Sequence, residues 1–239
     1  MINFIKILKN TTMKRISVII MLSSFLIVSI FSQECSFYYP KTKGATLEYK
    51  SYDKKNSLTG ITRHQVKDIV QSGNTVSATI EVEAFDKKEK LLGTNEFTVR
   101  CEGGIYYIDM KNYMNSEALA AYEDMDITIE SDNLEIPSSL KVGDHLNDGS
   151  LVITVSSSGM KMMTMTTTIS NRKIDAKEKI TTEAGTFDCY KISYDITSKM
   201  MMTMNLSALE WYAKDVGMVK SESYSKGNLS GTTILTAIK

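Results

Sequence analysis

Methionine is the residue type that most suggests chemistry in this chain of 239 residues. Of the 12 methionines after position 32, eight lie in two short segments. These eight are Met160, Met162, Met163, Met165, Met200, Met201, Met202 and Met204. Thioethers are flexible and polarizable, so they can fill an irregular core, adapt to varied apolar ligands or bind the soft cation Cu(I). The sequence leaves all three roles open.

On an extended strand these methionines occupy both faces, because alternate side chains point to opposite sides. Met200, Met202 and Met204 share one face, whereas Met201 lies on the other. One face can belong to the core, and the second needs a lid, a lipid-like ligand or an envelope protein to cover it. We therefore assign the eight methionines, together with Trp211 on the same strand, to a hypothetical ligand or partner face.

Motifs for catalysis are missing from the sequence. His64 and His145 are its two histidines, and neither lies in a zinc-protease HExxH, a GxSxG elbow or a Gly-rich phosphate loop. His64 falls on an expected strand and His145 in the turn-rich loop GDHLNDG, so we expect each to be an ordinary surface or sheet-edge residue. We predict no catalytic residues, no cofactor and no enzyme activity, and we leave metal binding undetermined.

Three cysteines follow the basic and apolar N-terminal stretch, at Cys35, Cys101 and Cys189. Their wide spacing excludes the close cysteine pairs of structural zinc sites. In an oxidising compartment one pair can form a disulfide and leave one thiol free. Three pairings are possible.

Alternation of apolar and polar residues indicates β-strands along most of the chain. It is clearest at 74–85, where Val76, Ala78 and Ile80 alternate with hydroxyl-bearing and acidic residues. Comparable strands are predicted at 45–52, 61–70, 91–101, 105–110, 127–129, 151–155, 160–170, 172–181, 186–197, 200–212, 218–225 and 229–238. Short turns separate most of them, which favours antiparallel pairing. We expect a mainly β fold, a large curved antiparallel sheet or a partly closed barrel.

The central region 111–148 differs from the rest. Its segment SEALAAY at 116–122 is the only run of good helix formers and can make at most two turns. Pro137 and the loop GDHLNDG then predict an irregular connection. We expect this region to form a short helix or lid across one opening or edge of the sheet.

The first 32 residues are typical of a secretory signal peptide. Four basic residues precede an apolar run at 16–31 with no acidic residue. That run is shorter than the roughly 20 residues of a spanning helix, so we predict cleavage near Ser32, with Met1 or Met13 as the start site. Residues 33–239 then form a single exported all-β domain without a transmembrane span, in the periplasm, at the outer membrane or outside the cell.

Charge excludes one class of partner. From Gln33 onward the chain has 24 basic and 28 acidic residues and is mildly acidic. It has no basic run interleaved with aromatic residues, so we predict no nucleic-acid binding.

Three strings resemble a known family. ITTEAGTFDCYKISYD at 180–195, EWYAKDVGMVKSESY at 210–224 and the earlier ECSFYYP are similar to the TapB-like family of exported Bacteroidetes proteins of unknown function. The resemblance covers 33–239 and implies an extracytoplasmic all-β domain without established catalytic residues. Our hypothesis is a non-catalytic cell-envelope protein that binds an apolar ligand or a protein partner on a sheet face. An enzyme and a Cu(I)-binding periplasmic protein are the alternatives.

Overall fold

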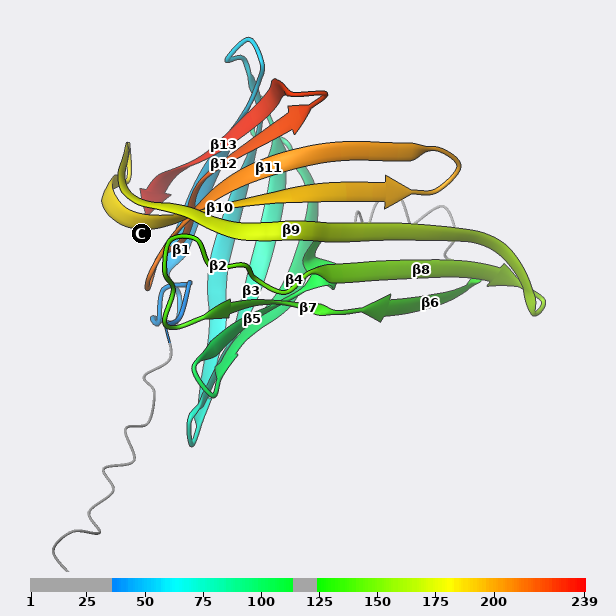
Figure 1. The fold of residues 1–239 in the computed structure, drawn as a ribbon, viewed down its shortest axis with the longest axis horizontal. Helices are drawn as coiled ribbons and strands as arrows, with labels where there is room; N and C mark the ends of the chain where they lie inside the picture. Colours follow the sequence, from blue (N-terminus) through cyan, green and yellow to red (C-terminus); the bar gives the residue numbers. More distant parts are fainter. Residues whose placement is uncertain (1–35, 114–123) are drawn as a thin grey trace, which may run out of the picture. The chain divides into compact units, whose positions relative to one another are not determined.

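Residues 36–113 and 124–239 are the parts of the chain that the computed structural model describes. They form one antiparallel sheet of thirteen strands and a single 3-10 turn (Figure 1). The predicted signal peptide and the helix predicted at 116–122 lie outside these ranges. Within them, no helix has the length and apolar character needed to cross a membrane.

The elements in chain order are β1 (Thr46–Asp53), β2 (Leu58–Ser72), β3 (Thr75–Asp86), β4 (Leu91–Glu102), β5 (Ile105–Asp109), η1 (Met110–Tyr113), β6 (Asp126–Ser131), β7 (Asn133–Pro137), β8 (Gly149–Ser157), β9 (Met160–Thr182), β10 (Gly185–Lys199), β11 (Thr203–Ala213), β12 (Gly217–Ser225) and β13 (Asn228–Ile238). Consecutive strands pair as hairpins from β1 to β5 and from β8 to β13, whereas β6 pairs with β8 and β7 pairs with β5. The prediction of a mainly β, antiparallel fold is confirmed.

The sheet bends round until its two edges meet. Its strand order begins at β6 and ends at β7, and β1 and β13 pair with each other in its middle. Asp132 alone separates β6 from β7 in the chain, so one continuous segment pairs with β8 on one side and with β5 on the other (Figure 1). The result is a nearly closed, barrel-shaped sheet.

Asp132 joins the two edges through its backbone and its side chain. Its carbonyl accepts a hydrogen bond from the amide of Met110 at 3.1 Å, and its own amide donates to the carbonyl of Ser150 at 2.9 Å. Its carboxylate accepts from the amide and the hydroxyl of Ser150 at 2.9 and 2.8 Å. The β7 strand was not predicted, because Pro137 and neighbouring polar residues indicated a loop.

One predicted strand boundary is a bulge instead. The sequence divides residues 160–181 at position 171, whereas β9 runs through it. Asn171 and Arg172 together stand opposite Tyr194 of β10, and Asn171 has a φ of 56°. A bulge of this kind bends a strand and re-aims its side chains, and here it leaves Arg172 buried.

Buried side chains form two clusters. The larger spans both halves of the sheet and includes Phe37, Tyr38, Ile80, Tyr106 and Ile192, and the smaller includes Leu47, Tyr49, Cys189, Trp211 and Leu235. The segment before β1 thus inserts two aromatic residues into the core. Gly217 allows this approach: its φ is 110°, and a Cβ there would lie 2.9 Å from the carbonyl oxygen of Tyr38.

Candidate functional site: a cavity lined by the sheet

Most of the clustered methionines are at the surface. Six of the eight are exposed, from 52% at Met200 to 89% at Met201, and only Met163 and Met165 are half-buried. The strand predicted to begin at Met200 begins at Thr203, so residues 200–202 are the loop between β10 and β11. Among the eight, Met165 packs against the larger core cluster. Core filling therefore explains Met165 and not the six exposed methionines.

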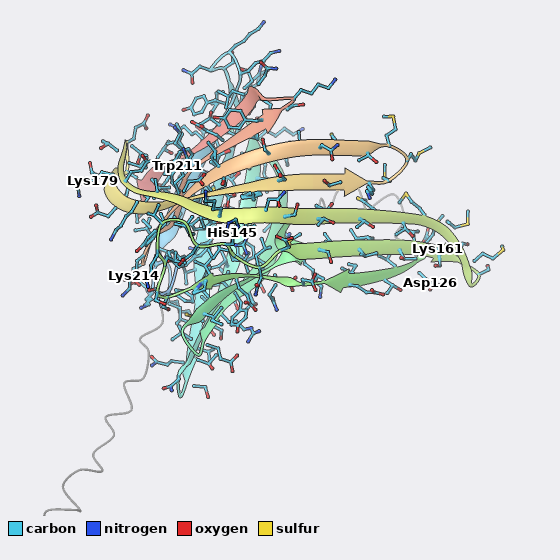
Figure 2. The ribbon with its side chains drawn as sticks, viewed as in Figure 1. Asp126, His145, Lys161, Lys179, Trp211 and Lys214 are labelled. Carbon is cyan, nitrogen blue, oxygen red and sulfur yellow. The ribbon has the colours of Figure 1, made fainter. Side chains whose placement is uncertain are left out.

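Trp211 lies apart from the methionines. It is seven residues beyond Met204 on β11, toward the opposite end of the strand (Figure 2). It is 4% exposed, and its Nε1 donates a hydrogen bond to Oε1 of Glu178 at 2.6 Å. The ammonium groups of Lys191 and Lys220 lie 5.3 and 4.8 Å from its ring. These contacts make Trp211 part of the smaller core cluster, apart from the exposed methionines with which the sequence analysis grouped it.

A cavity of about 330 Å³ lies between the two core clusters, and we name it the central cavity. Strands β1, β2, β4, β5, β11, β12 and β13 supply most of its wall, and one residue comes from the segment before β1. The lining residues are Tyr39, Tyr49, His64, Phe97, Val99, Tyr106, Ile108, Glu210, Tyr212, Met218, Ser221 and Thr233. Aromatic and aliphatic side chains dominate, and few groups are polar.

His64 is the imidazole of this wall. Its Nδ1 lies 2.7 Å from the hydroxyl of Tyr39, and the two rings are nearly parallel, with 9° between their planes. The Phe97 ring meets His64 edge-on, and the Tyr49 ring centroid is 4.9 Å away. Burial among these rings lowers the pKa of His64 to about 4, because the charged imidazolium loses its hydration. His64 is therefore neutral at pH 7.

Glu210 is the buried acid of the same wall. Burial raises the pKa of its carboxyl, while hydrogen bonds from Tyr194 and Tyr212 and the charge of Arg172 act in the opposite direction. The charge of Glu210 also adds to the burial that raises the pKa of the Tyr49 hydroxyl. A carboxyl, an imidazole and several phenols thus line one cavity.

The bulge in β9 places the cation Arg172, whose charge acts on Glu210. It leaves Arg172 3% exposed, and the guanidinium donates hydrogen bonds to the carbonyls of Glu135 and Asn147 at 3.2 and 2.7 Å. These bonds connect β9 to β7 and to the loop that follows it. Part of the 111–148 region, expected to be a lid, instead completes the sheet and holds Arg172.

A groove rich in hydroxyl groups lies next to the central cavity. Both share Ser221 and Thr233 in their walls, and the groove continues along β1, β12 and β13 past Ser51 and Ser223. The hydroxyls of Ser51 and Thr233 lie 2.9 Å apart, so they satisfy each other across the strands. The cavity thus has one side where polar groups replace aromatic ones.

The cysteines and the metal-ligating residue types form no further site in the described residues. Cys101 is in a disulfide and Cys189 is a buried free thiol, which excludes both pairings that involve Cys189. No group of three or more His, Cys, Asp or Glu side chains gathers to hold a metal ion anywhere in 36–113 or 124–239.

Comparison with known proteins places the chain in a family. The family model described as DUF3108-like matches residues 42–235, which is most of the chain and includes β2 and β11 of the cavity wall. The chain belongs to the DUF3108-like family. A comparison with curated proteins finds no match.

Solved structures share the fold of this DUF3108-like chain. A Bacteroides fragilis protein, described as exported and as having a YmcC-like fold, is 23% identical with a TM-score of 0.71, over 86% of this chain and all of that one. A Parabacteroides distasonis protein described as a lipoprotein is 24% identical with a TM-score of 0.72, over 87% of this chain and all of that one. At these identities the likeness shows the fold alone, and it confirms the fold class.

Sequence reasoning missed the central cavity of this DUF3108-like protein. The surface or sheet-edge position predicted for His64 is wrong, since β2 pairs with strands on both sides and the half-buried ring lines the cavity. His145 is exposed, as predicted. A signal for His64 exists: it has the same strand parity as the buried Val66. Glu210 likewise lies on the same face of its strand as Ala208 and Tyr212. A charged residue in an otherwise apolar alternation indicates a polar side chain that points into the protein.

Proposed function

We propose that this protein is a non-catalytic cell-envelope protein that binds a small apolar or amphipathic molecule in the central cavity. The cavity itself carries the proposal. Its volume of about 330 Å³ falls at the low end of the roughly 300–1,000 Å³ that small-molecule sites occupy. Such sites have mostly apolar walls and a few placed polar groups, which describes this wall.

The wall also favours a ligand class. Tyr49, Phe97 and Tyr106 offer aromatic surface to a ring or a short hydrocarbon chain. His64 is neutral, so the cavity supplies hydrogen-bonding groups without a fixed positive charge. The hydroxyl-rich groove at Thr233 provides a place for an uncharged polar end. A phospholipid with two long chains is too large for this volume.

Export rests on the N-terminal residues and on the relatives. The signal-peptide pattern at 1–32 is supported by structural relatives described as an exported protein and a lipoprotein. The narrower TapB-like resemblance, which is more specific than the DUF3108-like family, stays a prediction. A protein partner at the exposed methionines remains the alternative to a small ligand.

Titration with the neutral dye N-phenyl-1-naphthylamine tests the proposal. Its fluorescence rises in an apolar site, so the native protein should give saturable binding at one dye per chain. Thr233→Phe places an aromatic ring at the junction of cavity and groove and should weaken dye binding at least about tenfold, because the available volume falls. Thr181→Phe, at an exposed position of β9, is the matched control and should bind like the native protein.

Two outcomes contradict the cavity as the binding site. The first is dye binding by Thr233→Phe with native affinity, and the second is equal weakening by both phenylalanine variants. Native mass spectrometry of the exported protein should also show an adduct that Thr233→Phe loses. If the native protein shows no adduct and no saturable dye binding, the proposed function is rejected.

A catalytic role is the second candidate, and one observation favours it. Burial lowers the pKa of His64 and raises that of Glu210, so one cavity contains two titratable groups with shifted pKa values, as active sites often do. A pKa of about 4 makes His64 a weak base at pH 7, which favours binding over catalysis. Turnover of a bound native adduct by the protein, lost in Glu210→Gln, would reverse this preference.

A further inference from the structure

The two methionine segments, 35 or more residues apart in the chain, lie side by side in the structure. The pairing of β9 with β10 ends at Thr166 and Lys199, so Met165 and Met200 are the residues that come next on the two chains. Sulfur atoms mark the ends of the β8–β9 and β10–β11 hairpins on the same side of Figure 2, near the labelled Lys161. The sequence could not show that these segments form one surface.

Strand register places methionines from both segments on one face. Ser198 of β10 pairs with Thr167 of β9 on one side and with Met204 of β11 on the other. Met165 is two residues from Thr167, so its side chain is on the same face of β9. Met165 and Met204 therefore lie on one face of the sheet, and the side chain that β10 places between them is the small Ser198. Met200 is the residue that follows β10 at this point.

Burial divides these methionines into fixed and accessible ones. Met165 is half-buried and packs against the core, which holds its strand position. Met200 and Met204 are 52% and 59% exposed. A ligand from solvent can therefore reach the accessible sulfurs beside an anchored one.

The residue types favour a ligand that requires sulfur. Stretches 160–168 and 199–205 together contain eight threonine, lysine and asparagine residues, but their only large apolar residue is methionine, with no Leu, Ile, Val, Phe or Trp. Leucine or phenylalanine would serve a membrane or a protein partner equally well, since they bury comparable apolar area. Thioether sulfur differs from them in its affinity for soft metal ions.

The surrounding charges are compatible with a soft monovalent cation. Neither stretch contains His, Cys, Asp or Glu, so a hard divalent cation has no carboxylate ligand there. Lys199 pairs with Thr166 and Thr203, which puts its side chain on the face opposite to Met165 and Met204. Asp126 lies on β6, which β8 separates from β9, and it pairs with Ser156 of β8.

We propose that Met165, Met200 and Met204 form a thioether site for Cu(I) or the chemically similar Ag(I). The site lies outside the central cavity and does not depend on the function proposed for it. Thioether ligands stay neutral and need no deprotonation, so the affinity should not depend on pH between 5 and 8.

Ag(I) tests the site without redox chemistry. It needs no reductant, so the disulfide of Cys101 stays intact, and Cys189→Ala serves as background to remove the free thiol. In protein labelled with [methyl-13C]methionine, titration in chloride-free buffer should shift the methyl signals of Met165, Met200 and Met204 and saturate at one Ag(I) per chain. The remaining methionine signals should stay in place.

Variants identify the ligands. Met200→Leu combined with Met204→Leu should lower the Ag(I) affinity at least about tenfold, because even loss of a group that supports a metal ligand lowers affinity about 10- to 100-fold. Met110→Leu, a fully buried methionine elsewhere, is the control and should leave it unchanged. The proposal is rejected if no methyl signal shifts, if all exposed methionines shift without saturation, or if the double variant keeps native affinity.

Discussion

The hydroxyl of Tyr39 and the Nδ1 of His64 lie 2.7 Å apart, in the wall of the central cavity. Tyr39 belongs to the segment before β1 and His64 to β2, so this contact ties the start of the described chain to the sheet. It also supplies a partner for an imidazole that has lost much of its hydration. Because burial lowers the pKa of His64 to about 4, protonation of this ring should oppose folding.

Acid should therefore lower the free energy of unfolding, because His64 binds a proton more readily in the unfolded state. The unfolded imidazole has a pKa of about 6.5, so between pH 6.5 and 4 the unfolded state binds more protons and stability falls as pH falls. The free energy of unfolding of the native protein, relative to that of His64→Gln, should fall by about 2 kcal/mol between pH 7 and pH 5. Urea unfolding at the two pH values measures this difference. Glu210, whose pKa is raised, has the opposite pH dependence and is common to both proteins. An equal difference at both pH values would contradict the burial of His64.

Gly217 should be intolerant of a side chain. Its φ of 110° is strained for any other residue, and a Cβ would lie 2.9 Å from the carbonyl oxygen of Tyr38. We expect Gly217→Ala to lower the free energy of unfolding by about 3 kcal/mol. Gly227→Ala is the control: its φ is 76° with nothing within 4 Å of the added Cβ, so only about 1 kcal/mol should be lost. Equal losses would show that the approach of Tyr38 contributes nothing.

Cys189 should be unreactive while the protein is folded. Burial raises the pKa of its thiol to about 12, with the charges of Asp188 and Glu178 acting in the same direction. The thiolate is the reactive form, so alkylation by iodoacetamide at pH 8 should be at least about 100-fold slower in the native state than in urea. Mass spectrometry of peptides containing Cys189 measures this ratio. Rapid modification without denaturant would mean that the smaller core cluster opens readily.

The strands were predictable because their signal is local. Alternation along β3 and short polar turns identify most hairpins without knowledge of the tertiary structure. β7 was missed because the pairing that creates it joins Tyr106 on β5 to Ile136, thirty residues later. A short segment containing Pro137 gives no local sign of such a partner.

The candidate site was less predictable for the same physical reason. His64, Glu210 and Tyr39 line one cavity although they come from three separate segments, and their separation in sequence hides this. The methionine clusters were visible at once, but exposure depends on where β10 ends, and its end at Lys199 leaves Met200 to Met202 in a loop. Residue type thus suggested the chemistry, whereas sheet closure and strand length decided the location.

Asp132 should control closure of the sheet. Its carboxylate accepts two hydrogen bonds from Ser150 at the single residue that joins β6 to β7. Loss of the carboxylate should therefore destabilise the pairing of both edge strands. We expect Asp132→Ala to lower the free energy of unfolding by about 2 kcal/mol and to speed amide exchange throughout β6 and β7. Asp132→Asn keeps one acceptor oxygen and should lose less.

Asp53 offers a matched comparison for this prediction. Its carboxylate also accepts two hydrogen bonds, from the amides of Lys55 and Ser57, but within the β1–β2 turn. Asp53→Ala should therefore speed exchange in that turn and leave β6 and β7 protected. If Asp132→Ala also affects only its immediate neighbours, the edges are held by backbone pairing alone. Faster exchange along both strands would instead show that one carboxylate couples the two edges of the sheet, and with them the enclosure of the central cavity.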